Sequence, residues 1–243
     1  MPTNASRYHS APCVAVFGGC GGAGASTLAA GLARSALRSG RAVVLVDGDP
    51  LGGGLETLLA DELSDGSPGP VSRSGPHEPA GSGAGSSAVA LYPQRPRDSG
   101  LTVLSWGRPD GAPIPPDAMR LALSELAGAA ELLVVDLPRT LGDATRIAAA
   151  YATHSLLIVP VAERAAISSH RLLTQLGVLG PRPGLVARLP SRDLLDPPHL
   201  AQLLRLPLSG VLKHGRDRST LQRASLDRFC LRFVDSLFGS VTT

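Results

Sequence analysis

The sequence predicts an α/β fold in which a doubly wound, mostly parallel sheet forms the middle of three layers. Seven short apolar runs have the continuous hydrophobicity of strands that are buried on both faces. Segments with helical periodicity separate most of these runs, which is typical of strand–helix–strand units. A glycine-dense turn follows the first run, and ligands in such sheets bind at the carboxyl ends of the strands. The functional site is therefore expected at that edge.

The first part of the chain alternates strand and helix signals. Residues 1–12 predict a flexible arm. The predicted elements that follow are a strand at 13–17, a helix at 26–39 that Gly40 ends, a strand at 42–46 and a short helix at 54–60. Between Ser64 and Ser87, 17 of 24 residues are Gly, Pro or Ser. Such a segment cannot bury enough apolar surface to offset its ordering entropy, so a disordered insertion is predicted at about 64–99.

The pattern resumes after the insertion, so residues 13–243 are predicted to form a single domain. The predicted elements are strands at 101–105, 132–136, 155–161, 185–188 and 208–212, and helices at 116–127, 142–151, 165–176 and 198–204. An amphipathic helix is expected at about 219–238. It either docks on the sheet or lies on a membrane surface. Docking is favoured because its polar face carries acids as well as arginines.

The composition argues against a phosphate loop with a lysine, a metal site made of cysteines and a membrane span. Of the 23 basic residues only Lys213 is a lysine, so no lysine can stand in a phosphate loop near the N-terminus. The net charge of +3 does not by itself indicate nucleic acid, and no specific nucleic-acid binding is predicted. The three cysteines lack metal-ligand spacing. No apolar run reaches the roughly 18 residues of a membrane span. A cytoplasmic protein is expected.

The glycine-dense turn fits two nucleotide-binding templates. As a dinucleotide fingerprint it matches at Gly19, Gly21 and Gly24, with Asp47 where a ribose-binding acid would stand. As a P-loop it matches from Gly19 to Ser26 except that the lysine is replaced by Ala25. Either way, its backbone N–H groups and the helix that follows form an anion site.

Three further features favour the P-loop. Ser26 and Thr27 directly follow the turn, where a hydroxyl would hold Mg²⁺. Asp47 and Asp49 offer two carboxylates after the second strand, which suit metal and water better than ribose alone. Asp136 ends a run of four apolar residues, as a Mg²⁺-polarising carboxylate does in P-loop proteins.

Together these motifs resemble the MinD/ParA superfamily of deviant Walker ATPases, and most closely its septum-site-determining Ssd group, also called CpaE-like or TadZ-like. The matching segments include GGCGGAGAST at 18–27, DPLGGGL at 49–55 and LLVVDLPRT at 132–140. The resemblance covers about 13–60 and 101–238. It implies a P-loop NTPase fold that binds ATP and Mg²⁺.

The resemblance also implies a role for each residue of the site. It places phosphate contacts at four loop positions, Mg²⁺ at Ser26 and Asp136, and the α-phosphate near Thr27. Asp47 and Asp49 match the carboxylates that position the attacking water. The four phosphate-contact positions are Gly21, Gly22, Gly24 and Ala25, and Ala23 and Arg188 are further expected nucleotide-binding residues.

The partners are implied by the same resemblance. Relatives act in division-site selection or in the assembly of Tad-type pili and secretion systems. The expected partners are therefore a second copy of the chain in a nucleotide-linked homodimer, division or Tad pilus and secretion proteins, and the inner face of the plasma membrane.

The chain departs from the sequence pattern of the deviant Walker ATPases at two positions. Active relatives carry lysines where this sequence has Cys20 and Ala25. Because lysine acts on phosphate as a point charge, its loss predicts nucleotide binding with slow or absent hydrolysis. Arg139 and Arg188 are the candidates to supply charge instead. Two alternatives stay open: a nucleotide-free pseudo-ATPase scaffold, and an NAD- or FAD-dependent oxidoreductase, for which the sequence offers no acid–base set.

Overall fold

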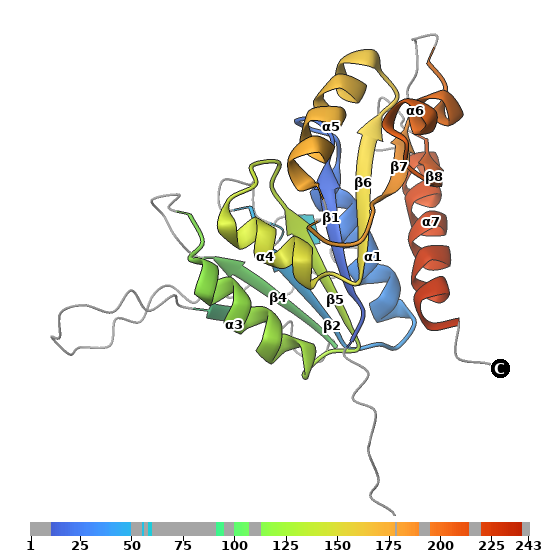
Figure 1. Ribbon diagram of the computed structural model, residues 1–243. Helices are drawn as coiled ribbons and strands as arrows, with labels where there is room; N and C mark the ends of the chain where they lie inside the picture. Colours follow the sequence, from blue (N-terminus) through green and yellow to red (C-terminus); the bar gives the residue numbers. More distant parts are fainter. Residues whose placement is uncertain are drawn as a thin grey trace, which may run out of the picture.

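The computed structural model describes residues 11–49, 55, 58–59, 91–94, 100–106, 113–177, 179–189, 195–213 and 220–239. Its centre is an eight-stranded sheet with the order β3-β4-β2-β5-β1-β6-β7-β8 (Figure 1). The strands are β1 (Cys13–Gly18), β2 (Val43–Asp47), β3 (Leu91–Gln94), β4 (Leu101–Trp106), β5 (Leu132–Leu137), β6 (His154–Pro160), β7 (Gly184–Arg188) and β8 (Leu208–Leu212). All pair in parallel except β3, which runs antiparallel to β4. The mostly parallel sheet is confirmed.

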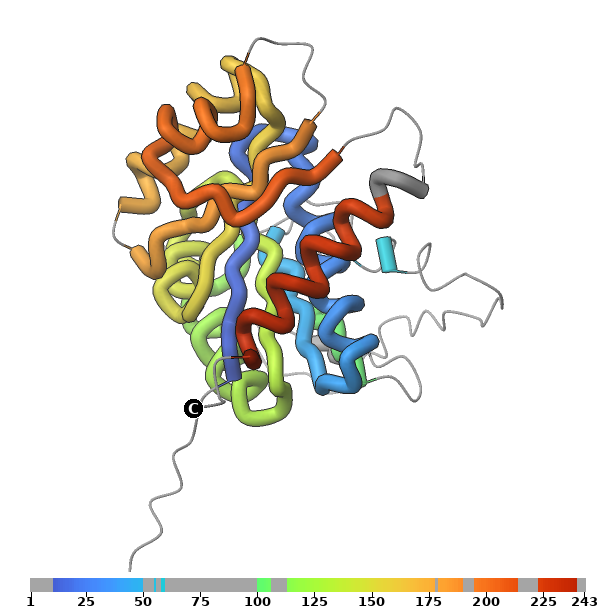
Figure 2. Tube along the Cα trace, turned by 90° about the vertical axis from the view of Figure 1, so that its right-hand side faces the viewer, coloured from blue at the N-terminus to red at the C-terminus, as the bar shows by residue number. Residues whose placement is uncertain are grey.

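Helices cover both faces of this sheet, which makes three layers. The helices are α1 (Ala25–Arg38), α3 (Pro116–Ala127), α4 (Asp143–Tyr151), α5 (Glu163–Leu176), α6 (Pro197–Leu204) and α7 (Thr220–Phe238). On one face of the sheet, α3, α4, α5 and α6 pack against the strands and form one apolar core. On the other face, α1 and α7 pack against the strands and form a second apolar core. Figure 2 shows α7 running beside α1 across the sheet. The doubly wound fold class is therefore confirmed.

The central strand β1 is flanked by β5 on one side and β6 on the other. Every residue of β1 is buried, as is every residue of β5 and β2, so these strands form continuous apolar runs and do not alternate. Because the chain leaves β1 where the winding direction of the sheet reverses, the loop after Gly18 lies at the topological switch point. The fold thus puts the glycine-dense turn where a ligand would bind.

Two predicted boundaries are wrong where the structure describes them. The disordered insertion was expected to reach 99, yet Leu91–Gln94 forms β3 on the edge of the sheet. Pro93 is compatible with this strand because an edge strand leaves one side of its backbone unpaired. The predicted arm was expected to reach Pro12, whose carbonyl accepts a hydrogen bond from Leu133 N at 2.9 Å. Residues 1–10, 61–90 and 95–99 lie outside the described residues.

The C-terminal helix α7 docks its apolar face on α1 and β8. A Cβ atom at Gly31 of α1 would lie only 3.1 Å from Cys230 Sγ, so the two helices approach closely at this glycine. A salt bridge of 2.5 Å joins Arg34 to Asp227. The Phe229 ring covers Gly210 of β8, where an added Cβ would lie 2.5 Å from the ring. In this structure α7 is therefore docked on the rest of the protein, which is the alternative that the sequence favoured.

Phe229→Ala should therefore lower the free energy of unfolding by about 3 kcal/mol, because it removes a large side chain from the core between α7 and β8. Phe229 is 4% exposed, whereas Leu231 on the same helix is 45% exposed. The matched control Leu231→Ala should cost much less. Urea denaturation of both variants checks this, and equal losses would contradict the docked arrangement.

None of the helices in the described part of the chain is long and apolar enough to cross a membrane.

Candidate functional site

The glycine-dense turn lies between β1 and α1, at residues 19–24, and is called the glycine loop from here on. It curls back on itself at the carboxyl edge of the sheet. Gly19 N donates to Ile158 O at 2.9 Å, and Ala23 N donates to Cys20 O at 3.2 Å. Gly22 and Gly24 have φ values of +67° and +101°, which residues with a side chain rarely adopt. Gly24 directly precedes α1, and the first turn of α1 carries no acidic residue. The loop therefore presents free helix N–H groups to an anion.

Two buried carboxyl groups stand beside this loop on neighbouring strands. Asp47 ends β2 and is the register partner of Asp136 on β5. Asp47 is 7% exposed and Asp136 is 3% exposed. The two oxygens of Asp47 accept hydrogen bonds from Asp49 N at 3.1 Å and Leu55 N at 3.3 Å. Asp47 thus holds the backbone of Asp49 and Leu55 while lying beside Asp136.

Asp136 connects the carboxylates to the loop. Burial raises the pKa of Asp136 to about 7, a hydrogen bond with the Ser26 side chain opposes this rise, and the charges of Asp47 and Asp49 add to it. The structure therefore brings together Ser26 from α1, Asp136 from β5, and Asp47 and Asp49 from the end of β2.

This donor set fits Mg²⁺ only together with a phosphate ligand. The Ser26 hydroxyl and the Asp136 carboxylate are hard oxygen ligands of the kind that Mg²⁺ prefers. Among the described residues, no group of three His, Cys, Asp or Glu side chains could hold a metal ion without help. Mg²⁺ sites commonly use one or two protein oxygens and complete their coordination with substrate phosphates and water.

The two candidate arginines lie in different environments. Arg188 ends β7, and its Nη1 atom is 3.2 Å from the position that a Cβ at Gly24 would occupy. Burial lowers the pKa of Arg188, whereas Cys20 raises it. Arg139 is exposed, and its Nη1 atom lies 3.5 Å from Ser168 Oγ. Of these two arginines, Arg188 is the one that contacts the glycine loop.

Close packing at Gly48 is the feature of the site that the sequence reasoning missed. An added Cβ there would lie 2.6 Å from the backbone oxygen of Asp136 and 2.9 Å from Leu137 Cδ2. Gly48 N also donates to Asp136 O at 2.8 Å. The position of this glycine between Asp47 and Asp49 was the signal that could have found it.

Gly48→Ala should lower the free energy of unfolding by about 1–3 kcal/mol, because backbone atoms and not a flexible side chain must move to admit the methyl group. Gly21 provides a matched control, since an added Cβ there meets nothing within 4 Å and its φ is not positive. Thermal unfolding of both variants measures the difference. A Gly48→Ala protein as stable as the Gly21→Ala protein would contradict the packing.

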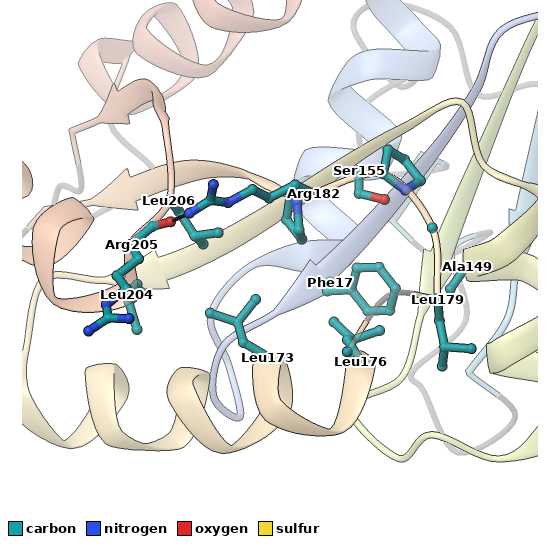
Figure 3. A pocket seen from close by; sticks show the side chains of 14 residues that line it. Phe17, Ala149, Ser155, Leu173, Leu176, Leu179, Arg182, Leu204, Arg205 and Leu206 are labelled. Atoms are coloured by element: carbon teal, nitrogen blue, oxygen red, sulfur yellow. Dashed lines mark hydrogen bonds between the residues drawn. The ribbon is translucent and has the colours of Figure 1, made fainter.

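The structure also has a cavity of about 390 Å³ that none of these site residues lines. Figure 3 shows side chains that line it. It is lined by Leu176 and Gly177 at the end of α5, by Pro183 just before β7, and by Leu204 at the end of α6. These positions belong to the amino edge of the sheet, opposite the glycine loop. Its lining is largely apolar, and the Arg182 side chain at its rim donates to the backbone oxygen of Arg205. The cavity is separate from the candidate phosphate site.

Solved structures of known ATPases share this fold. A ParA family ATPase from Chlorobium tepidum has a TM-score of 0.68 at 12% identity, covering 93% of this chain and 98% of that one. The MinD cell division protein of Aquifex aeolicus has a TM-score of 0.66 at 16% identity, covering 96% and 99%. The septum site-determining protein MinD of Pyrococcus horikoshii, complexed with Mg-ADP, has a TM-score of 0.65 at 16% identity, covering 94% and 98%. The chain thus has the P-loop fold of the MinD and ParA ATPases.

Sequence comparison finds relatives in Mycobacterium tuberculosis. Two uncharacterized proteins, from two strains of Mycobacterium tuberculosis, are each 34% identical over 230 residues, which is 87% of this chain. The chain spans 61% of the length of these relatives. No family model matches the chain.

Proposed function

We propose that the chain is an ATP-binding protein of the MinD/ParA type that holds ATP and Mg²⁺ at its glycine loop and hydrolyses ATP slowly or not at all. The observation that carries the proposal is the buried Asp136 carboxyl, hydrogen-bonded to Ser26 beside a glycine loop with positive φ at Gly22 and Gly24. A dinucleotide site needs no acid paired with this serine, so the pairing supports the P-loop over the oxidoreductase alternative.

Each residue of the site has a proposed task. The backbone of Gly21, Gly22, Ala23, Gly24 and Ala25 contacts phosphate, and Thr27 lies near the α-phosphate. Ser26 and Asp136 hold Mg²⁺, which when bound neutralises charge on the phosphate oxygens. Asp47 and Asp49 orient water. Asp47 is suited to this task because its hydrogen bonds to the Asp49 and Leu55 backbone hold the carboxylate in place.

Slow hydrolysis follows from two missing charges. Cys20 and Ala25 occupy the positions of the lysines that the resemblance to deviant Walker ATPases leads us to expect. Removing one electrostatic contact to a developing charge costs about 3–4 kcal/mol in comparable enzymes. Backbone N–H groups remain for binding in the ground state.

The cellular role that we propose is positioning, in septum-site determination or in the localisation of a Tad-type pilus or secretion system. The resemblance to the Ssd and CpaE-like group supports this role, as does the fold shared with MinD. One MinD structure with this fold, from Aquifex aeolicus, is a MinC:MinD cell division protein complex. We propose that the chain works in the cytoplasm as a nucleotide-linked homodimer, with peripheral contact to the inner face of the plasma membrane. Since α7 buries its apolar face, it does not provide that contact while docked.

A nucleotide-free scaffold is the second candidate, and the absence of both lysines favours it. Analytical ultracentrifugation of the full chain with and without ATP and Mg²⁺ separates the two candidates. We expect Mg-ATP to shift the chain from monomer to dimer, and Ser26→Ala to abolish the shift. A sedimentation profile that ATP leaves unchanged, together with no binding of ATP, would favour the scaffold.

A further inference from the structure

We propose that Arg188 supplies the phosphate-binding cation that the glycine loop lacks, so that a polyphosphate is held by a side chain from β7 and not by a lysine within the loop. This inference rests on the proposed ATP site and assigns the part of the ligand that Arg188 contacts.

The backbone at Arg188 is fixed by the sheet. Arg188 is the last residue of β7 and the register partner of Pro160 on β6. Its carbonyl accepts a hydrogen bond from Val161 N at 2.9 Å. Because β6 lies between β7 and β1, the Arg188 side chain must cross the end of β6 to reach the loop. A rigid strand therefore aims this side chain, which favours precise placement of its charge.

The guanidinium group lies beside the end of the glycine loop that leads into α1. Its Nη1 atom is 3.2 Å from the point where a Cβ at Gly24 would stand, directly before Ala25. It also interacts electrostatically with Cys20, at the other end of the loop. Gly24 leaves room for this contact because it has no side chain. This arginine thus lies close to Gly24, next in sequence to Ala25, and within electrostatic range of Cys20.

One hydrogen-bond donor of this arginine has no acceptor in the part of the chain that the structure describes. Arg188 Nε is buried and has no hydrogen-bond partner within the described residues. Leaving a buried charged donor unsatisfied is unfavourable, and an anion that accepted a hydrogen bond from it would remove that cost. A guanidinium group presents several N–H donors in a planar fork that matches phosphate oxygens. The free donor, the neighbouring loop N–H groups and the missing lysines all favour a phosphate ligand.

Arg188→Gln should weaken Mg-ATP binding about 10- to 100-fold, as expected for loss of a charge-assisted hydrogen bond. Inorganic pyrophosphate should lose affinity by a similar factor, since it offers the same phosphate oxygens. Binding of adenosine should change little. Arg171→Gln, which changes an exposed arginine on α5, is the matched control and should bind all three ligands like the unmodified chain.

Moving the positive charge from Arg188 into the glycine loop provides a second test. Ala25→Lys in the Arg188→Gln background should restore at least about tenfold of the lost ATP affinity, because it returns a cation to the same phosphates. Arg188→Lys should fall between the unmodified chain and Arg188→Gln, since it keeps the charge but loses the planar fork. The rescue also shows that the loss in Arg188→Gln is not a loss of folding.

The outcomes separate this inference from the proposed function. If the unmodified chain binds Mg-ATP and Arg188→Gln binds it equally well, Arg188 is not the phosphate cation and the inference fails while the ATP site stands. If adenosine binding falls as much as pyrophosphate binding, Arg188 does not act on phosphate. If the unmodified chain binds neither ATP nor pyrophosphate, both proposals fail together.

Discussion

Placing lysine at both positions that lack it should raise ATP turnover about 100- to 1000-fold above that of the unmodified chain. The change is Cys20→Lys combined with Ala25→Lys. Cys20 and Ala25 lie at the two ends of the curled loop, next to Gly21 and Gly24, so both new ammonium groups would start within reach of bound phosphates. Lysine adds a mobile point charge that can follow the transferring phosphoryl group, which fixed backbone N–H groups cannot do.

Phosphate release under saturating Mg-ATP measures this gain. Adding Asp49→Asn to the double variant should remove most of it, since we propose that Asp49 helps to position the attacking water. A double variant that binds ATP tightly but hydrolyses it no faster would show that missing lysines are not what limits turnover.

Asp136→Asn should stabilise the ligand-free protein by about 4 kcal/mol at pH values above 7 and have little effect at about pH 4. The pKa of Asp136 is raised by burial from 3.8 to about 7 in the folded chain. Folding therefore favours the protonated carboxyl. The associated stability is fully present below about pH 4 and is lost as the pH rises to about 7. Asparagine does not ionise, so the variant avoids this loss.

Urea denaturation of both proteins across that pH range tests the expectation. The difference in the free energy of unfolding should grow from about pH 4 to about pH 7 and then level off. A difference that stays constant with pH would show that Asp136 is not the titrating group. Because Mg²⁺ needs the ionised carboxylate, the stabilisation of the unmodified chain by Mg-ATP should increase over the same range, and Asp136→Asn should lose it.

Much of the fold could be predicted because its strands are nearly continuous apolar runs. Buried strands such as Leu132–Leu137 have a signal that does not depend on distant partners. Helix ends were also visible locally, as at Gly40, whose φ of +77° follows the end of α1. The short strand Leu91–Gln94 was missed because its pairing with β4 is a tertiary contact, and its sequence sits next to a segment rich in Gly, Pro and Ser.

Only part of the candidate site could be predicted from the sequence. Ser26, Asp47 and Asp136 could be chosen because each follows a strand or loop with a known spacing. The hydrogen bond between Ser26 and Asp136 and the burial of both carboxyl groups come from strand order, since β5 lies between β2 and β1. Nothing local distinguishes Arg188 from Arg139. Only the crossing over β6 brings Arg188 to Gly24, whereas Arg139 is exposed beside Ser168.

A calorimetric titration of the protein with ATP in the presence of Mg²⁺ tests directly whether the glycine loop binds nucleotide. We predict saturable binding of one ATP per chain, lost in Ser26→Ala and weakened when Mg²⁺ is removed. Phosphate release under the same conditions should be slow. Absence of both heat and a thermal shift at millimolar ATP would contradict the claim that this glycine loop is a nucleotide site.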